Sequence, residues 1–340
     1  MKYLAIDIGG TYTKYAVMDE NCSFYEKDKI PTAQDNLESF INMLVDIYKA
    51  HAEDIEGIGI SSAGMIDSET GFMYNGGSIP CISSINLVEI LEKYCQVPVT
   101  VENDAKCAAL AELWRGSLSD CTNAVAVICG TAVGGAVICD RKVMRGKNFM
   151  AGEFSYILTD SEDCMNSDKT LAMTNGVPAL IRLVAQKKNI SAKELDGEKV
   201  FSMANCGDHE VLNCIRIFAR NLAVQLSNYQ FILDPDRIAI GGGISAQPLF
   251  LQMIKEELKK LSSVFPYDVP IPDITNCKFF NDSNLIGALY VHLKAREEKI
   301  DVNKVKEFMD FLQDRREGQY LRELFIANNN LGGNKDETQI

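Results

Sequence analysis

The sequence predicts an α/β protein made of two similar lobes followed by a helical extension. Residues 3–19 and 123–139 each place apolar runs on both sides of a Gly/Thr centre, which is typical of a strand, a tight turn and a second strand. Strand-like segments then alternate with segments of helical spacing, which indicates an α/β architecture. A length of 340 residues also suits two domains better than one.

The elements of the first half follow the first hairpin in order. Residues 37–50 space their apolar side chains as a helix does, and residues 55–61 are typical of a buried strand. A loop rich in Gly, Ser and Asn then extends to residue 84. A short strand at 97–101 and a helix at 105–114 complete this half.

The second half continues the alternation after the second hairpin. Helical spacing predicts helices at 177–185, 209–231 and 285–293. Residues 237–243 are typical of a strand that enters a glycine turn.

The tail differs in composition. Its apolar residues predict one helical face and then another, formed by Val305, Phe308, Met309 and Leu312 and by Leu321, Leu324 and Phe325. Residues 328–340 are mostly Asn, Gly and charged, so we expect disorder there. We therefore divide the chain into an N-terminal α/β lobe (1–118), a C-terminal α/β lobe (119–296) and a helical extension with a disordered tail (297–340).

Composition and charge argue against several classes of function. A net charge of -13 disfavours nucleic acid as a partner, because phosphate binding needs a basic surface. The 11 cysteines form no C-x-x-C pair and no signal peptide precedes the first strand, so we expect reduced thiols and a cytoplasmic protein. The longest apolar stretch, at 123–139, is too short and too interrupted to span a membrane.

The turn of the first hairpin is a candidate phosphate site. Its glycines let backbone N–H groups point outward, its threonines add hydroxyl donors and its lysine adds positive charge. Asp7 could hold Mg²⁺ through water. The candidate residues are Asp7, Gly9, Gly10, Thr11, Thr13 and Lys14. The alternative is an ordinary glycine hairpin with an exposed lysine. It is not a P-loop, because the chain has no G-x-x-x-x-G-K-[ST] segment.

Two later glycine turns could bind other parts of a nucleotide. The turn of the second hairpin contributes Gly130, Thr131 and Gly134, and the turn after the strand near 237 contributes Gly241, Gly242 and Gly243. Consecutive glycines suit a position that a flat adenine or ribose approaches closely. The alternatives are a plain hairpin turn and a tight strand-to-helix turn.

Polar residues between these turns are candidates for a substrate site. Asn103 and Asp104 stand between a strand and a helix, where either could cap the helix. A carboxylate there could also orient a hydroxyl group and accept its proton late in phosphoryl transfer. Glu153 could accept two sugar hydroxyls or be a surface residue, and Gly64 and Asn75 could add contacts from a loop that is otherwise a solvated turn.

Taken in order, these motifs resemble those of the ROK family (repressors, open reading frames and sugar kinases). The similarity extends from residue 2 to about 293. It covers residues 7–14, 103–104, 130–135, Arg145 and Gly146 with 151–153, 234–235 with 241–243, and 281–288. The resemblance implies an actin-like (ribonuclease H-like) sugar kinase fold, ATP and Mg²⁺ as cofactors, Asp104 as the base, Asn103 and Glu153 as sugar contacts, and a homodimer.

The sequence also departs from the family pattern. Tyr156 stands where the family usually has a His, and residues 158–174 contain one cysteine, Cys164, in place of a Cys-rich zinc loop. We therefore expect no zinc site. Ala132 replaces a usual Gly in the second phosphate turn. Tyr156 could offer a ring for a second sugar or an aglycone, or it could pack in the core.

The resemblance implies phosphorylation of the 6-hydroxyl of a glucose-like hexose or of a β-glucoside. The alternatives are an N-acetylhexosamine (N-acetylmannosamine) kinase and a sugar-sensing member without catalysis. A repressor is disfavoured, because the first phosphate motif begins at residue 7 and leaves no room for a preceding DNA-binding domain.

Overall fold

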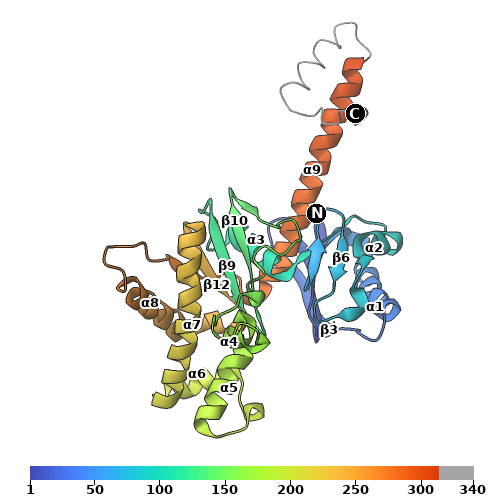
Figure 1. Cartoon of the computed structure of the whole chain (residues 1–340). Helices are drawn as coiled ribbons and strands as arrows, with labels where there is room; N and C mark the ends of the chain where they lie inside the picture. Colours follow the sequence, from blue (N-terminus) through green and yellow to red (C-terminus); the bar gives the residue numbers. More distant parts are fainter. Residues whose placement is uncertain (314–340) are drawn as a thin grey trace, which may run out of the picture. The chain divides into compact units, whose positions relative to one another are not determined.

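The computed structural model describes residues 1–313 and contains two five-stranded sheets (Figure 1). The first sheet has the order β3 (Phe24–Pro31), β2 (Tyr12–Asp19), β1 (Lys2–Ile8), β4 (Ile55–Ser62) and β8 (Val99–Asn103). The second has the order β11 (Lys142–Val143), β10 (Val133–Cys139), β9 (Ala124–Cys129), β12 (Arg237–Gly241) and β13 (Ile274–Asn276).

The two sheets share one topology. In each, the first hairpin is antiparallel, as in β1–β2 and β9–β10. Each then adds two parallel strands beside the first strand, β4 and β8 in one sheet and β12 and β13 in the other. This repeat confirms the predicted two-lobed actin-like fold. The residue limits of the lobes stay a prediction.

Two helices and a small sheet complete the first lobe. The helix α1 (Leu37–Lys49) is capped by Asn36, whose side chain accepts the backbone N–H of Ser39. The helix buries Phe40 and Leu44. With α2 (Leu87–Cys95) it closes a core that includes Ile6 and Ile58. The small sheet consists of β5 (Met65–Asp67), β6 (Phe72–Asn75) and β7 (Ile85–Asn86).

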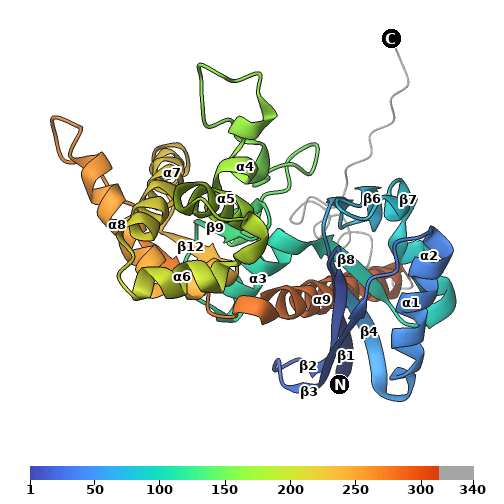
Figure 2. The same ribbon diagram turned by 90° about the horizontal axis from the view of Figure 1, so that it is seen from below.

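The helix α3 (Asp104–Arg115) links the lobes and is buried along most of its length. Nine of its twelve residues are buried, which its alanines and cysteine allow. A Cβ on Gly287 would lie 1.9 Å from the carbonyl oxygen of Cys107, so the first turns of α9 lie directly against α3 (Figures 1 and 2). The buried carboxylate of Glu112 ties the end of α3 to the chain before α9. It accepts from Ser117 N (2.7 Å) and Oγ (3.0 Å), Lys278 N (2.8 Å) and Phe279 N (3.1 Å).

Helices of the second lobe enclose a separate core against its sheet. They are α4 (Leu171–Asn175), α5 (Val177–Lys188), α6 (Gly197–Asn205), α7 (His209–Leu233) and α8 (Pro248–Ser262). Short 3₁₀ turns stand at Ala52–Asp54, Pro80–Ile82, Phe154–Tyr156, Ser167–Lys169, Ala192–Glu194, Gly243–Ala246 and Phe280–Asp282.

The last described element is α9 (Ser283–Gln313). Met1–His292 form one compact unit, and the chain from Leu293 onward belongs to a second. The predicted apolar faces of the tail, and the disorder predicted for 328–340, lie outside the residues whose side chains the structure describes. Within the described chain, every helix is too short or too polar to cross a lipid bilayer.

Candidate active site

The carboxyl ends of β1 and β4 bring Asp7 and Ser61 together. Asp7 is buried, and its Oδ1 accepts hydrogen bonds from Ser61 Oγ (3.0 Å) and Asn284 Nδ2 (2.9 Å). The Lys14 ammonium lies 3.6 Å from the other oxygen, Oδ2. Both hydrogen bonds therefore fall on Oδ1, whereas Oδ2 faces the Lys14 ammonium.

At the start of α3, two adjacent residues have different roles. Asn103 is the cap: its Oδ1 accepts Lys106 N–H at 3.1 Å, and its Nδ2 donates to the carbonyl of Gly64 at 3.1 Å. Asp104 is the first helical residue, and its Oδ1 accepts the backbone N–H of Ala105 at 2.8 Å. The capping role considered for either residue therefore belongs to Asn103.

The pKa of Asp104 is raised, and its surroundings explain why. Burial disfavours the charged carboxylate most, and the nearby charge of Asp7 adds to the effect. The Ala105 N–H and the charge of Lys106 act in the opposite direction. A carboxylate with a raised pKa is a better proton acceptor than an ordinary Asp.

A loop of the first lobe lies against the Asn103 side chain. Gly64 has φ +119°, and a Cβ there would lie 2.2 Å from the carbonyl oxygen of Asn75, so only glycine fits. The Asn75 side chain accepts the N–H groups of Met65 and Gly77, both at 3.2 Å. The structure thus places Gly64, Asn75 and Asn103 together, with the Asn75 amide oxygen used inside the loop.

A buried lysine that the sequence reasoning missed lies beside these groups. Lys106 is 2% exposed; its Nζ lies 3.7 Å from Glu153 Oε1 and donates to the carbonyl of Phe149 at 3.2 Å. Burial raises the pKa of Glu153, with Lys106 opposing and Asp104 adding to the rise. Glu153 therefore stands near Asp104 and is partly buried, not a free surface residue.

A second ion pair ties the segment before Glu153 to β8. The buried carboxylate of Glu102 accepts from Arg145 Nη2 at 2.7 Å and from Asn103 N–H at 2.8 Å. Arg145 Nε also donates to Ser68 Oγ at 2.8 Å. The sequence reasoning noted Arg145 but assigned no role to Glu102.

The second glycine turn lies next to the third and to the start of α3. A Cβ on Gly134 would lie 2.9 Å from the Cβ of Ala105, which puts the second hairpin against the start of α3. Gly242 has φ +85°, and a Cβ there would lie 2.0 Å from the Cys129 carbonyl oxygen. Gly130 and Gly243 have no atom within 4 Å of such a Cβ, so the space in front of both is open.

The first turn combines exposed and buried parts. Thr11 is exposed, whereas Thr13 is fully buried with its hydroxyl 3.0 Å from that of Thr32. Gly10 lies against Ser78. Outward donors of this turn would therefore come mainly from its backbone and from Thr11.

Tyr156 and the predicted metals complete the set of site predictions. Tyr156 is 68% exposed, so the alternative that it packs in the core is wrong. Among the described residues, no group of three or more His, Cys, Asp or Glu side chains is arranged to hold a metal. The predictions of Mg²⁺ through water and of no zinc stay predictions.

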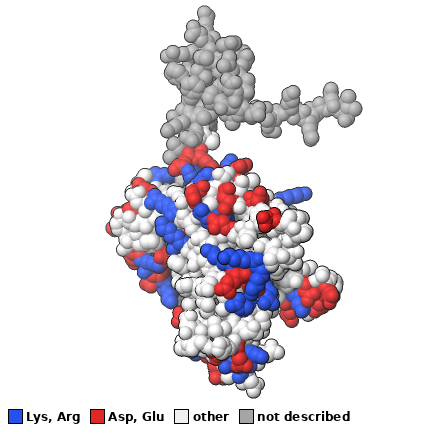
Figure 3. Space-filling model, turned by 90° about the vertical axis from the view of Figure 1, so that its left-hand side faces the viewer, with Lys and Arg blue, Asp and Glu red and all other residues white. Residues whose placement is uncertain are grey.

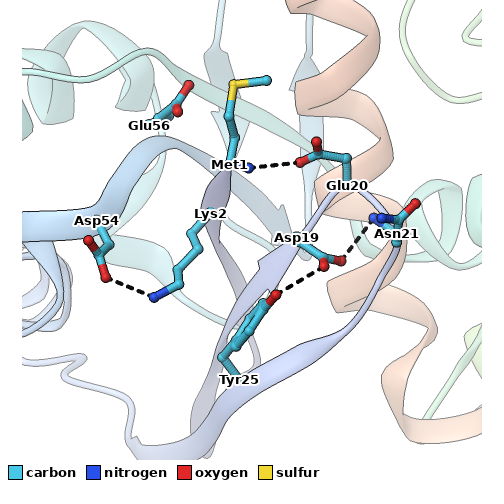
Figure 4. A pocket seen from close by; sticks show the side chains of 8 residues that line it. All are labelled: Met1, Lys2, Asp19, Glu20, Asn21, Tyr25, Asp54 and Glu56. Carbon is cyan, nitrogen blue, oxygen red and sulfur yellow. Dashed lines mark hydrogen bonds and ion pairs between the residues drawn. The ribbon is translucent and has the colours of Figure 1, made fainter.

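A separate depression lies at the other end of the first sheet (Figure 4). Its lining comes from the amino ends of β1 and β4 and the β2–β3 turn: Met1, Lys2, Asp19, Glu20, Asn21, Tyr25, Asp54 and Glu56. The Lys2 ammonium contacts Asp54 at 2.7 Å and the terminal amine contacts Glu20 at 3.3 Å. Because Asp7 lies at the opposite end of β1, this depression is not part of the candidate active site.

The outer face of the second lobe mixes both signs of charge (Figure 3). Between α7 and α8, the Glu257 carboxylate pairs with Arg216, Arg220 and Lys260. This pairing offsets part of the positive charge of these three side chains.

Comparisons with known proteins point to one family. The model of the ROK family matches residues 3–295. A β-glucoside kinase from Listeria innocua is 32% identical over 296 residues, covering 86% of this chain and 98% of that protein. An N-acetyl-D-glucosamine kinase from Shigella boydii is 27% identical over 305 residues, covering 86% and 99%. The crystal structure of a ROK family protein from Streptococcus pneumoniae in complex with sucrose has a TM-score of 0.79 at 32% identity, covering 88% of this chain and all of that one.

Proposed function

We propose that this chain, which belongs to the ROK family and is a sugar kinase, uses ATP to phosphorylate the 6-hydroxyl of the glucose unit of a β-glucoside. One observation carries the proposal. Asp104 stands at the start of α3 with the capping role taken by Asn103, among the charges of Asp7, Lys106 and Glu153. This arrangement suits a base that orients a substrate hydroxyl.

The mechanism starts from the position of the sugar. Glu153 would accept from two neighbouring ring hydroxyls, as a carboxylate can. Asn103 would donate to a third sugar oxygen through the Nδ2 hydrogen that the Gly64 carbonyl does not use. The 6-hydroxyl would then donate to Asp104. In a loose phosphoryl-transfer transition state the proton moves late, so the carboxylate mainly orients the nucleophile and accepts the proton as the new P–O bond forms.

The glycine turns would hold the nucleotide. The backbone N–H groups of Gly10, Thr11 and Thr131 would bind the phosphates, because those of Gly9 and Gly130 donate to the carbonyls of Tyr12 and Ala132 within the turns. The open space before Gly243 would take the adenosine. Mg²⁺ bound through water to Asp7 would neutralise the charge that develops on the transferred phosphoryl group. Positioning and charge neutralisation supply most of the acceleration in this chemistry.

Two observations support a β-glucoside over free glucose as substrate. Tyr156, three residues from Glu153, is exposed and offers a ring to a group attached to the sugar. The relative from Listeria innocua is named a β-glucoside kinase. The similar Streptococcus structure was solved with sucrose, whose glucose is α-linked, so it supports room for a second sugar ring and not the β-linkage. The relative from Shigella boydii keeps an N-acetylhexosamine kinase as a second candidate. The cytoplasmic location and the homodimer stay predictions.

The test is a substrate panel with the full chain, ATP and Mg²⁺ in a coupled kinase assay. We expect the largest kcat/KM for cellobiose, a smaller value for glucose and the smallest for N-acetylmannosamine and N-acetylglucosamine. Mass spectrometry and phosphorus NMR should place the phosphate on the 6-oxygen. A preference for an N-acetylated sugar would favour the second candidate, and absence of turnover with every sugar would refute a kinase.

A further inference from the structure

An aromatic pair joins the two lobes beside the candidate sugar site. Tyr74 on β6 stacks on Phe149, which lies in the segment before Glu153, with ring centroids 5.4 Å apart and an interplanar angle of 25°. Tyr74 is 48% exposed, and Phe72 packs an edge against it at 5.0 Å. Neither Tyr74 nor Phe149 belongs to a hydrophobic core cluster, so their stacking does not serve the interior.

The backbone holds Phe149 in a costly conformation. Its φ is +58°, in the left-handed region that bulky side chains rarely adopt. The buried Lys106 fixes this conformation, because its Nζ donates to the Phe149 carbonyl while it also pairs with Glu153. Strained residues that the surroundings hold in place cluster at ligand sites.

Residues of the candidate sugar site flank the pair on both sides. Tyr74 precedes Asn75, whose carbonyl contacts Gly64, and Gly64 in turn accepts a hydrogen bond from Asn103. Phe149 is linked through Lys106 to Glu153. The rings therefore stand at the rim of the proposed glucose site, on the first lobe and on the second.

We propose that Tyr74 and Phe149 form the subsite for the second ring of a β-glucoside, either a second sugar or an aromatic aglycone. This inference rests on the proposed function and names the part of the site that would read the group beyond glucose. A flat, fixed and partly exposed ring pair gives apolar contact to one face of such a group while its polar edges stay in water. Tyr156, the exposed ring already named as a contact for this group, has no ring partner among residues 1–299, so we place the fixed part of the subsite at Tyr74 and Phe149.

The test compares substrates in variants of the full chain. Tyr74→Ala removes the exposed ring, Tyr74→Phe keeps it without the hydroxyl, and Tyr94→Ala is a matched control because Tyr94 is also exposed (59%) but lies on α2. We expect Tyr74→Ala to lower kcat/KM about tenfold for cellobiose and for an aryl β-glucoside, mainly through KM. Glucose phosphorylation should stay within about twofold, and Tyr74→Phe and Tyr94→Ala should resemble the wild type.

Each other outcome overturns the subsite. An equal loss for glucose and cellobiose would make the pair a contact that only closes the lobes, and no loss for either would leave it without a role. Loss of the cellobiose preference in Tyr156→Ala but not in Tyr74→Ala would move the subsite to Tyr156. The wild type is measured first: if it phosphorylates no sugar, the proposed function itself fails, whereas turnover of both sugars without discrimination by Tyr74→Ala refutes only the subsite.

Discussion

Replacing Asp104 with Asn tests the proposed base with little change in geometry. Asn has nearly the same shape, and its side-chain oxygen can still accept the Ala105 N–H that Asp104 accepts at 2.8 Å. The helix cap is untouched, because Asn103 provides it. Asp104→Asn therefore removes the proton acceptor and leaves the start of α3 in place.

The expected loss in kcat is about 10²–10⁴-fold, the usual contribution of a general base. At about 1.4 kcal/mol for each factor of ten, this equals roughly 3–5.5 kcal/mol of transition-state stabilisation. Sugar affinity should change little, since Asn103 and Glu153 remain.

Stability should move in the opposite direction. Burial raises the pKa of Asp104 in the folded protein, so its ionised form weakens folding as the pH rises through that pKa. A neutral Asn avoids this loss. Asp104→Asn should therefore unfold at an equal or higher denaturant concentration than the wild type at neutral pH.

The assay measures kcat by coupled turnover, sugar binding by calorimetry and unfolding by urea. Asn103→Ala is the contrasting variant: it loses the cap, at about 1 kcal/mol, together with the hydrogen bond to Gly64. Wild-type turnover in Asp104→Asn would refute the proposed base. Loss of turnover together with loss of folding would show that Asp104 is structural.

Three further predictions concern other groups. Lys106→Met should raise the pKa of Asp104 and of Glu153, because the charge of Lys106 lowers both, and the acidic limb of the kcat/KM profile should therefore move to higher pH. Lys106→Arg keeps the charge and should leave that limb in place. An acidic limb that does not move in Lys106→Met would contradict the argument. Removal of Mg²⁺ by a chelator should abolish turnover, and added Mg²⁺ should restore it; full activity in the chelator would contradict this. Elemental analysis should find no stoichiometric zinc, and a value of about one zinc per chain would contradict that expectation. Glu112→Ala should lower the free energy of unfolding by about 3 kcal/mol, because four hydrogen-bond donors lose a buried acceptor. Urea titration measures this, and an unchanged urea midpoint would show that water replaces the carboxylate.

Much of the fold could be predicted from the sequence, because a helix or strand with one buried face shows a regular spacing of apolar residues. The predicted helix at 37–50 is α1 (Leu37–Lys49), and the strand predicted at 55–61 is β4 (Ile55–Ser62). The third strand of the first sheet, β3, escaped prediction since nearly all its side chains are exposed and show no alternation. The helix α8 was also not predicted, although its sequence indicates one: a proline stands at its start, and apolar residues from Phe250 to Leu258 have helical spacing.

The site was predictable where chemistry is local in sequence and not where it depends on distant partners. Asn103 and Asp104 are adjacent, so the order of strand, polar pair and helix identified them. Lys106 looked like an ordinary helical lysine, because its partner Phe149 is 43 positions away and nothing local indicates burial. Glu102 likewise needs Arg145, also 43 positions away, to explain its burial.

The two sheets have the same strand order but different residues at the corresponding strand ends, so we expect mutations at these ends to act in different ways. The penultimate residue of β1 is the carboxylate Asp7, whereas that of β9 is Ile128; β8 leads into Asp104, whereas β12 ends at Gly241. At these strand ends the first copy of the topology therefore carries ionisable side chains, and the second carries an apolar residue and a glycine. In a saturation scan, damage at Asp7 should follow loss of charge even when volume is kept. Damage at Gly242, where any Cβ meets the Cys129 carbonyl, should follow added volume whatever its charge, so that alanine is nearly as harmful as aspartate.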